Sequence, residues 1–205
     1  MNWKNQIKTV FFDLFGVLLG IDQSVVIQYL SKLTETSYLK TREITMGESF
    51  MRLERDEIDF TQYVGEIRAA MPNGERIDVS SLRNIWMNST AGEMPAVSLL
   101  ESLQSNYQVW VISNTTDAHI ISLKSKFAFF NHVNGIITSE MAGVHKPNLK
   151  IFKVALSTAK TDPSSAIFID DSSANTKSAE NLGIVSHHYT EFDGLMGFLK
   201  GKVKI

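Results

Sequence analysis

The sequence predicts an α/β fold, in which a doubly wound parallel sheet is flanked by helices and carries an inserted helical subdomain. Short apolar segments alternate with helical patterns along the chain, which is typical of parallel sheets built from strand–helix–strand units. The interval between the first two predicted strands, residues 14–107, is several times longer than one crossover helix requires, and its pattern is helical. The long interval therefore predicts an insertion into the α/β core.

Five apolar segments are expected to form the sheet. Continuous apolar runs such as Val10-Phe11-Phe12 and Val109-Trp110-Val111-Ile112 are typical of strands that are covered on both faces, as in a parallel sheet. The predicted strands are residues 8–13, 108–113, 135–138, 166–170 and 184–187.

Helical patterns fill the intervals between these strands. Pro95 suits the first position of a helix. Ser172 or Ser173 is expected to cap a later helix that ends at Gly183, because glycine accepts the left-handed backbone found there. The apolar repeats that predict core helices are Leu99, Leu100 and Leu103; Ile120, Leu123, Phe127 and Phe130; Leu149, Phe152 and Leu156; and Phe192, Leu195 and Leu199.

Two parts are expected in the chain. Residues 1–19 and 92–205 would form the α/β core domain, and residues 20–91 a helical cap subdomain. The insert leaves the core just after Asp13, where open α/β sheets usually bind ligands, so it would be placed to cover a site and exclude water. The alternative is a purely structural elaboration of the fold.

Composition excludes several classes of function. The chain has 205 residues and no cysteine, which excludes disulfides, thiolate metal sites and cysteine nucleophiles. Its formal net charge of -2 argues against nucleic acid or a membrane surface as a partner. The apolar run at residues 9–21 is too short to span a bilayer, and Asp13 within it argues against a signal peptide. We expect a cytoplasmic protein that is a monomer or a homodimer.

Polar side chains follow the carboxyl ends of four predicted strands. Because these ends meet at one edge of a parallel sheet, the four strands would bring carboxylates, a hydroxyl, an amide and an ammonium together. In chain order the residues are Asp13, Ser113 with Asn114, Lys146 with Pro147, and Asp170 with Asp171. A single residue of this kind is weak evidence for a site, whereas the ordered set is much stronger.

The ordered set resembles the four motifs of the haloacid dehalogenase-like (HAD) hydrolase superfamily. The similarity covers residues 10–17, 109–114, 143–152 and 167–183, and the insert resembles the helical cap of the first subgroup. Met46-Gly47-Glu48-Ser49-Phe50 and Glu54-Arg55-Asp56-Glu57-Ile58 are similar to cap segments of a bacterial glucose-1-phosphate phosphatase branch. The resemblance implies a Rossmann-like core and a hydrolase that acts on a small phosphorylated metabolite with Mg²⁺.

For the reacting groups, the resemblance implies that Asp13 is the nucleophile. A strand-end carboxylate followed by Gly16 has room for in-line attack on phosphorus or carbon. Mg²⁺ would bind the carboxylates of Asp13 and Asp171 and the main-chain carbonyl of Phe15, since hard cations prefer oxygen ligands. Asp170 would orient the site or contact the metal through water. The alternative is that Asp170 and Asp171 cap the following helix.

The phosphate group would meet a second set of side chains. Lys146 would hold the phosphoryl group and the nucleophile as a point charge. Ser113 and Asn114 would bind phosphate oxygens at a helix start, where anions are favoured. Taken alone, a lysine in a turn or a Ser-Asn pair after a strand would not indicate a phosphate-binding site.

Phe15 departs from the usual phosphatase pattern, which has aspartate two residues after the nucleophile. That aspartate protonates the leaving oxygen and then activates water, which phenylalanine cannot do. General acid–base catalysis is worth about 10²–10⁴-fold in rate. The protein would be a phosphatase with a substitute group or an easy leaving group such as an anomeric sugar oxygen, a metal-free 2-haloacid dehalogenase-type hydrolase, or a weakly active phosphate-ester-binding protein. The paired acids at 170 and 171 favour the phosphatase, because a divalent cation relieves their repulsion.

Overall fold

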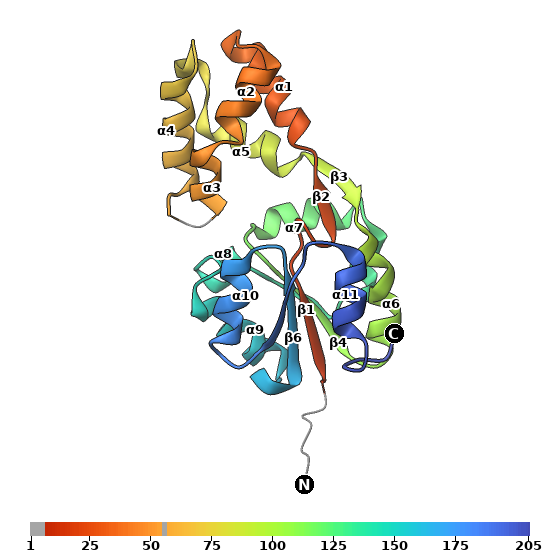
Figure 1. Cartoon of the computed structure of the whole chain (residues 1–205). Coiled ribbons are helices and arrows are strands. Elements are labelled where there is room, and N and C mark those ends of the chain that lie inside the picture. Colours follow the sequence, from red (N-terminus) through yellow and green to blue (C-terminus); the bar gives the residue numbers. More distant parts are fainter. Residues whose placement is uncertain (1–6, 55–56) are drawn as a thin grey trace. The chain divides into compact units, whose positions relative to one another are not determined.

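The computed structural model describes residues 7–54 and 57–205 (Figure 1). The chain divides into two compact units, one of Met1–Gly20 with Gly92–Ile205 and the other of Ile21–Ala91. The first boundary therefore falls one residue later than the division expected from the sequence. Residues 1–6 of the predicted core domain lie outside the described residues. So do Arg55 and Asp56, which belong to the segment at residues 54–58 that resembles a cap segment of the phosphatase branch.

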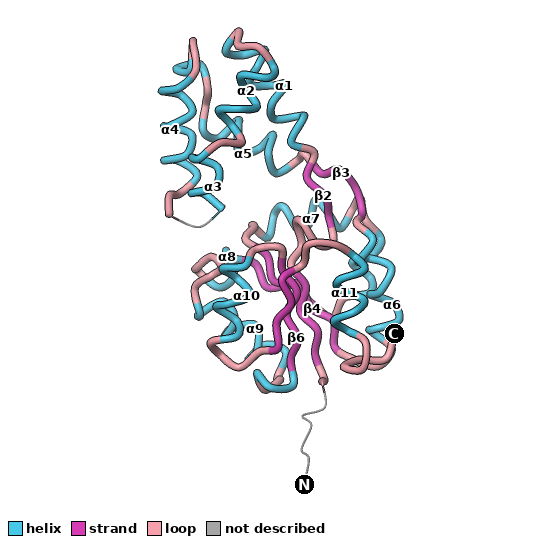
Figure 2. The backbone as a smooth tube through the Cα atoms, in the orientation of Figure 1, coloured by secondary structure: helices cyan, strands magenta, loops and turns pink. Residues whose placement is uncertain are grey.

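The first unit is built on a parallel five-stranded sheet (Figure 2). Its strands are β1 (Thr9–Phe12), β4 (Gln108–Ser113), β5 (Gly135–Thr138), β6 (Ala166–Asp170) and β7 (Val185–His188), in the spatial order β5-β4-β1-β6-β7. The chain runs from β1 toward one edge and from β6 toward the other, so the carboxyl ends of these two neighbours form the topological switch point. The predicted doubly wound parallel sheet is confirmed.

Helices cover both faces of this sheet. The apolar side chains of β1 alternate between the faces, because Val10 and Phe12 pack against one helical layer and Phe11 against the other. The first layer contains α6 (Leu100–Gln104), α7 (Asp117–Lys124) and α11 (Phe192–Leu199). The second contains α8 (Ser139–Ala142), α9 (Leu149–Ala159) and α10 (Ser173–Glu180) (Figure 1).

Three local predictions about these helices need correction. The segment at Pro95 begins as a 3₁₀ helix, Pro95–Leu99, before α6. The repeat from Ile120 to Phe130 is split between α7 and a 3₁₀ helix, Ala128–His132, because the backbone is extended at Phe127 while the apolar spacing continues across the break. Ser172 stands at the start of α10 without a side-chain capping bond. Instead, its main-chain N–H donates to Oδ1 of Asp170 at 2.8 Å.

The second unit is helical and has its own core. It contains α1 (Gln23–Thr34), α2 (Tyr38–Thr45), α3 (Glu48–Glu54), α4 (Phe60–Ala70), a 3₁₀ turn (Gly74–Arg76) and α5 (Val79–Met87). Leu30, Tyr63 and Ile67 are fully buried at its centre. Among the helices of the described residues, none has the length and apolar character needed to cross a membrane.

The expectation that residues 20–91 are wholly helical is wrong at both ends. β2 (Leu19–Ile21) pairs with β3 (Thr90–Glu93) in a separate two-stranded sheet. β3 has the sequence Thr-Ala-Gly-Glu, in which half-buried and exposed residues alternate. So short and polar a segment carries no apolar strand pattern, which is why the sequence could not reveal it.

Candidate functional site

Three carboxylates gather at the carboxyl ends of β1 and β6, the switch point of the sheet. Asp13 directly follows β1, Asp170 ends β6, and Asp171 is the next residue. One carboxylate oxygen from each lies within 4.8 Å of the others. Asp13 and Asp170 are buried, with 7% and 0% of their surface exposed, whereas Asp171 is exposed. The structure therefore brings together the carboxylates that the sequence predicted to meet.

The ammonium group of Lys146 lies between two of these acids. Its Nζ is 2.7 Å from Oδ1 of Asp13 and 2.6 Å from Oδ2 of Asp170. The lysine is only 1% exposed. An unpaired charge at such depth would cost several kcal/mol, so the two carboxylates are what permit its burial. Lys146 is thus part of the cluster rather than a solvated residue of a turn.

Asn114 positions the loop that carries Lys146. The main-chain N–H of Lys146 donates to Oδ1 of Asn114 at 2.7 Å, and Nδ2 of Asn114 donates to the Lys146 carbonyl at 3.0 Å. Both ends of the side-chain amide therefore hold the lysine backbone. Asn114 was predicted to bind phosphate, and that contact stays a prediction. The observed contact with the Lys146 backbone was not anticipated from the sequence.

The hydrogen bonds of Asp170 tie its carboxylate to the start of α10. Its Oδ2 accepts from Lys146, and its Oδ1 accepts from the main-chain N–H of Ser172 and, at 2.9 Å, from Nδ2 of Asn175. These bonds fix the position of the Asp170 carboxylate, and its predicted role in orienting the site stays a prediction. Asn175 was missed in the sequence, where only its place in the first turn after the paired acids could have drawn attention to it.

Ser113 brings a buried hydroxyl to the same edge. It ends β4, which lies beside β1, and is 1% exposed. Among the described residues, no atom forms a hydrogen bond with its Oγ. Burying a hydroxyl without a partner costs about 1–3 kcal/mol. A bound ligand with acceptor oxygens would remove this cost.

Burial and like charge disturb the ionisation of the cluster. Burial, followed by the charge of Asp170, raises the pKa of Asp13 well above its usual value, although Lys146 opposes the change. The same two causes, burial and the charge of Asp170, raise the pKa of Asp171. Burial lowers the pKa of Lys146, but the charges of Asp13 and Asp170 outweigh it and the net shift is upward.

The donor set fits a hard divalent cation. Three carboxylates face one ammonium, so the ionised cluster carries two formal negative charges in excess. Carboxylate and carbonyl oxygens are the ligands that Mg²⁺ prefers. A cation of charge two would balance the excess and favour the ionised forms of Asp13 and Asp171. We therefore regard Asp13, Asp171 and the Phe15 carbonyl as the candidate metal ligands.

Gly16 allows the turn after β1 to approach Asp171. Its φ of +85° lies in the left-handed region, and a β-carbon built on it would overlap the carboxylate of Asp171. The main-chain N–H of Gly16 donates to the Leu19 carbonyl at 2.8 Å, which closes the turn. Only glycine fits this position without moving the acid.

We expect Gly16→Ala to weaken Mg²⁺ binding by about 10- to 100-fold, the range seen when groups supporting metal ligands are disturbed. The new methyl group would displace Asp171 and strain the turn. Calorimetric titration of the folded protein with Mg²⁺ measures this effect. Gly197→Ala is the matched control, since a β-carbon there has nothing within 4 Å. If Gly16→Ala binds Mg²⁺ as tightly as the parent protein does, the proposed closeness of this turn to the metal is wrong.

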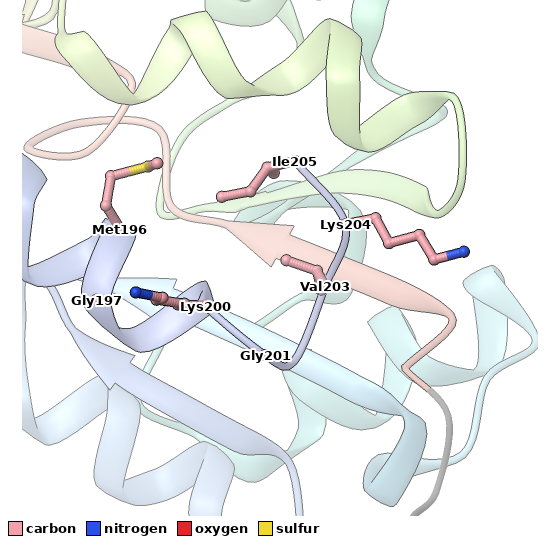
Figure 3. Close-up of a pocket in the computed structure, with 7 residues that line it drawn as sticks. All are labelled: Met196, Gly197, Lys200, Gly201, Val203, Lys204 and Ile205. Carbon is pink, nitrogen blue, oxygen red and sulfur yellow. The ribbon is translucent and has the colours of Figure 1, made fainter.

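A separate pocket of about 540 Å³ lies at the end of the chain (Figure 3). Its seven lining residues fall between Met196 and Ile205. The N–H of Lys204 donates to the hydroxyl of Tyr107, which directly precedes β4. This segment is therefore anchored at the amino end of β4, whereas the carboxylate cluster lies beyond the carboxyl ends of the strands.

Comparison with known proteins places these motifs in a family. The family model of haloacid dehalogenase-like hydrolases matches residues 7–183. D-ribitol-5-phosphate phosphatase of Bacteroides thetaiotaomicron is 22% identical over 192 residues, covering 86% of this chain and 89% of that protein. Bifunctional epoxide hydrolase 2 of Rattus norvegicus is 23% identical over 204 residues, covering 88% of this chain but only 36% of the rat protein.

A solved structure supports the same relationship. A HAD-family enzyme from Bacteroides thetaiotaomicron, in complex with magnesium and inorganic phosphate, is 28% identical to this chain with a TM-score of 0.60. The similarity covers 88% of this chain and 93% of that one. The match of the family model to most of the sequence agrees with the strand-end motifs and the parallel sheet that brings them together. The chain thus belongs to the haloacid dehalogenase-like hydrolase family.

Proposed function

We propose that this protein is a Mg²⁺-dependent phosphohydrolase that cleaves a small phosphate monoester, with sugar phosphates as the favoured class. The observation that carries the proposal is the cluster of Asp13, Asp170 and Asp171 around the buried ammonium of Lys146. A metal-free enzyme would have little use for three crowded carboxylates, two of which have raised pKa values.

In the proposed reaction, the carboxylate of Asp13 attacks phosphorus in line with the leaving oxygen. A bond forms between Asp13 and phosphorus while the bond to the leaving oxygen breaks, and water later hydrolyses the aspartyl-phosphate. Lys146 offsets negative charge on the phosphoryl oxygens, and the hydroxyl of Ser113 donates to one of them. When bound, Mg²⁺ supplies positive charge that polarises the phosphoryl group.

Phe15 restricts the substrates that such a site can use well. It cannot protonate a leaving alkoxide, so a substrate whose leaving oxygen is already acidic loses least from its presence. An anomeric sugar phosphate has such an oxygen, which supports sugar 1-phosphates as first candidates. The relatives support phosphate monoesters in general, because one is named for D-ribitol 5-phosphate and another was solved with phosphate and magnesium.

A panel of hexose 1-phosphates, hexose 6-phosphates and a pentitol 5-phosphate tests the proposal through phosphate release. We expect chelation of divalent metal to lower the rate by about 10²-fold or more, and added Mg²⁺ to restore it. Equal rates with chelator and with Mg²⁺ would remove the metal from the mechanism. Phosphate binding without turnover of any ester would instead identify a binding protein.

The aromatic residue at position 15 favours one other candidate, a 2-haloacid dehalogenase-type hydrolase, in which Asp13 would attack carbon. Such a reaction needs neither a leaving-group acid nor a metal. The paired Asp170 and Asp171 argue against it, because three crowded carboxylates need a divalent cation to balance their charge. Chloride release from 2-chloropropionate in the presence of chelator distinguishes the two, and we expect none.

A further inference from the structure

A histidine outside the predicted site contacts the residue that departs from the family pattern. The ring of Phe15 stacks on the imidazole of His119, with centroids 5.4 Å apart and planes 15° apart. Phe15 is half-buried, whereas His119, in the first turn of α7, is 7% exposed. The two rings belong to the loops and helices that follow neighbouring strands β1 and β4.

The imidazole is itself held by the loop that follows β4. Nδ1 of His119 lies 2.9 Å from Oγ1 of Thr115, within hydrogen-bonding distance. The Thr115 carbonyl accepts from Oγ of Ser139 at 3.0 Å, and the Thr115 N–H donates to the carbonyl of Ser113. His119 therefore stands on a support that is fixed to both β4 and the start of α8.

The main chain of Phe15 belongs to the tight turn that carries the nucleophile. Phe15 forms a β-bridge with Leu19, and the carbonyl of Leu14 accepts from the N–H groups of Leu18 and Leu19. Together with the bond from the Gly16 N–H to the Leu19 carbonyl, these bonds hold the peptide groups on both sides of Phe15. The stack on His119 adds a restraint on the side chain of the same residue.

We propose that His119 is a positioning residue for the metal site. By stacking on Phe15 and bonding to Thr115, it acts with the main-chain bonds of the turn to hold the Phe15 carbonyl in the orientation that binds the divalent cation. This inference rests on the proposed Mg²⁺-dependent function and on the Phe15 carbonyl as a candidate metal ligand. An aromatic stack that merely filled the core would stabilise the fold and leave metal affinity unchanged, so the two roles can be separated.

Calorimetric titration of the folded, substrate-free protein with Mg²⁺ tests the proposal. We expect His119→Ala to weaken Mg²⁺ binding by about 3- to 10-fold, the size of effect that one aromatic stack supports. His119→Phe, which keeps a stacking ring, is expected to bind Mg²⁺ within about twofold of the parent. In phosphate-release assays, the rate lost by His119→Ala should recover at high Mg²⁺, with little change in KM for the ester.

Phe129→Leu is the matched control for lost packing. It removes a different aromatic stack from the same core, that of Phe129 on Phe130. It should lower the melting temperature without changing Mg²⁺ affinity. If His119→Ala does not fold, Thr115→Val serves as the test in its place. This variant removes the hydroxyl partner of His119 and keeps the shape of the side chain. It should weaken Mg²⁺ binding by about two- to fivefold.

The failures of the two proposals are distinguishable. If the parent binds Mg²⁺ and His119→Ala, or Thr115→Val in its place, binds it equally well, the positioning role of His119 is overturned while the phosphohydrolase proposal stands. A parent protein that binds no Mg²⁺ would contradict the metal-dependent function itself, and the role of His119 with it.

Discussion

Replacing Asp13 with asparagine is expected to reduce phosphate release by about 10³-fold or more, because the amide cannot form the covalent bond to phosphorus. The fold should survive this change. Burial already favours the neutral form of Asp13, and its removal leaves Lys146 paired with Asp170. We therefore expect a melting temperature equal to or above that of the parent, which separates lost chemistry from lost structure.

Asp193→Asn provides the matched control for this prediction. It makes the same chemical change on the exposed first turn of α11 and should leave turnover within about twofold of the parent. Initial rates with a saturating ester and Mg²⁺ measure both variants. Mass spectrometry should verify that the asparagine at position 13 has not deamidated back to aspartate. Full activity in a verified Asp13→Asn protein would exclude this residue as the nucleophile.

Lys146→Met is expected to cost both activity and stability. It leaves the buried carboxylates of Asp13 and Asp170 without their cation, and breaking a buried ion pair typically costs about 3–5 kcal/mol. In a chain of this size, that loss would lower the melting temperature by roughly 10 °C. Calorimetry measures the unfolding transition, and phosphate release should fall below detection at the same time.

The exposed Lys150, four residues further along, offers the control Lys150→Met, which should change stability by no more than about 0.5 kcal/mol. The double variant Lys146→Met with Asp170→Asn should be less destabilised than the sum of its single changes, because it removes both charges of one contact. Equal melting temperatures for Lys146→Met and the parent would contradict the assignment of a buried, paired lysine.

The stability deficit of Lys146→Met should also depend on pH. Burial raises the folded-state pKa of Asp13 and Lys146 opposes the change, so loss of the ammonium should raise that pKa further and the folded variant should bind this proton more tightly. The deficit should therefore be small below the unfolded pKa of an aspartate, about 4, and should increase as the pH rises above it. Melting temperatures across this range check the direction.

The local apolar pattern and the order of the motifs along the chain were enough to predict the parallel sheet and which side chains meet at its edge. Apolar runs such as those around Phe11 and Val111 mark buried parallel strands, since the segments are short and flanked by helices. A parallel sheet brings the carboxyl ends of its strands to one edge. The proximity of Asp13, Lys146 and Asp171 was therefore predictable, although these residues are far apart in the chain.

Only the tertiary structure decided which side chains contact one another within that edge. The hydrogen bonds of Asn114 to Lys146, of Asp170 to the start of α10 and of His119 to Thr115 all depend on loop conformation. The stacking of His119 on Phe15 depends on it as well. Periodicity carries no information about loops, whose hydrogen bonds depend on the backbone conformation that each loop adopts. For the same reason the sequence could predict which charged side chains meet at the sheet edge but could not reveal the side chains that hold them in place.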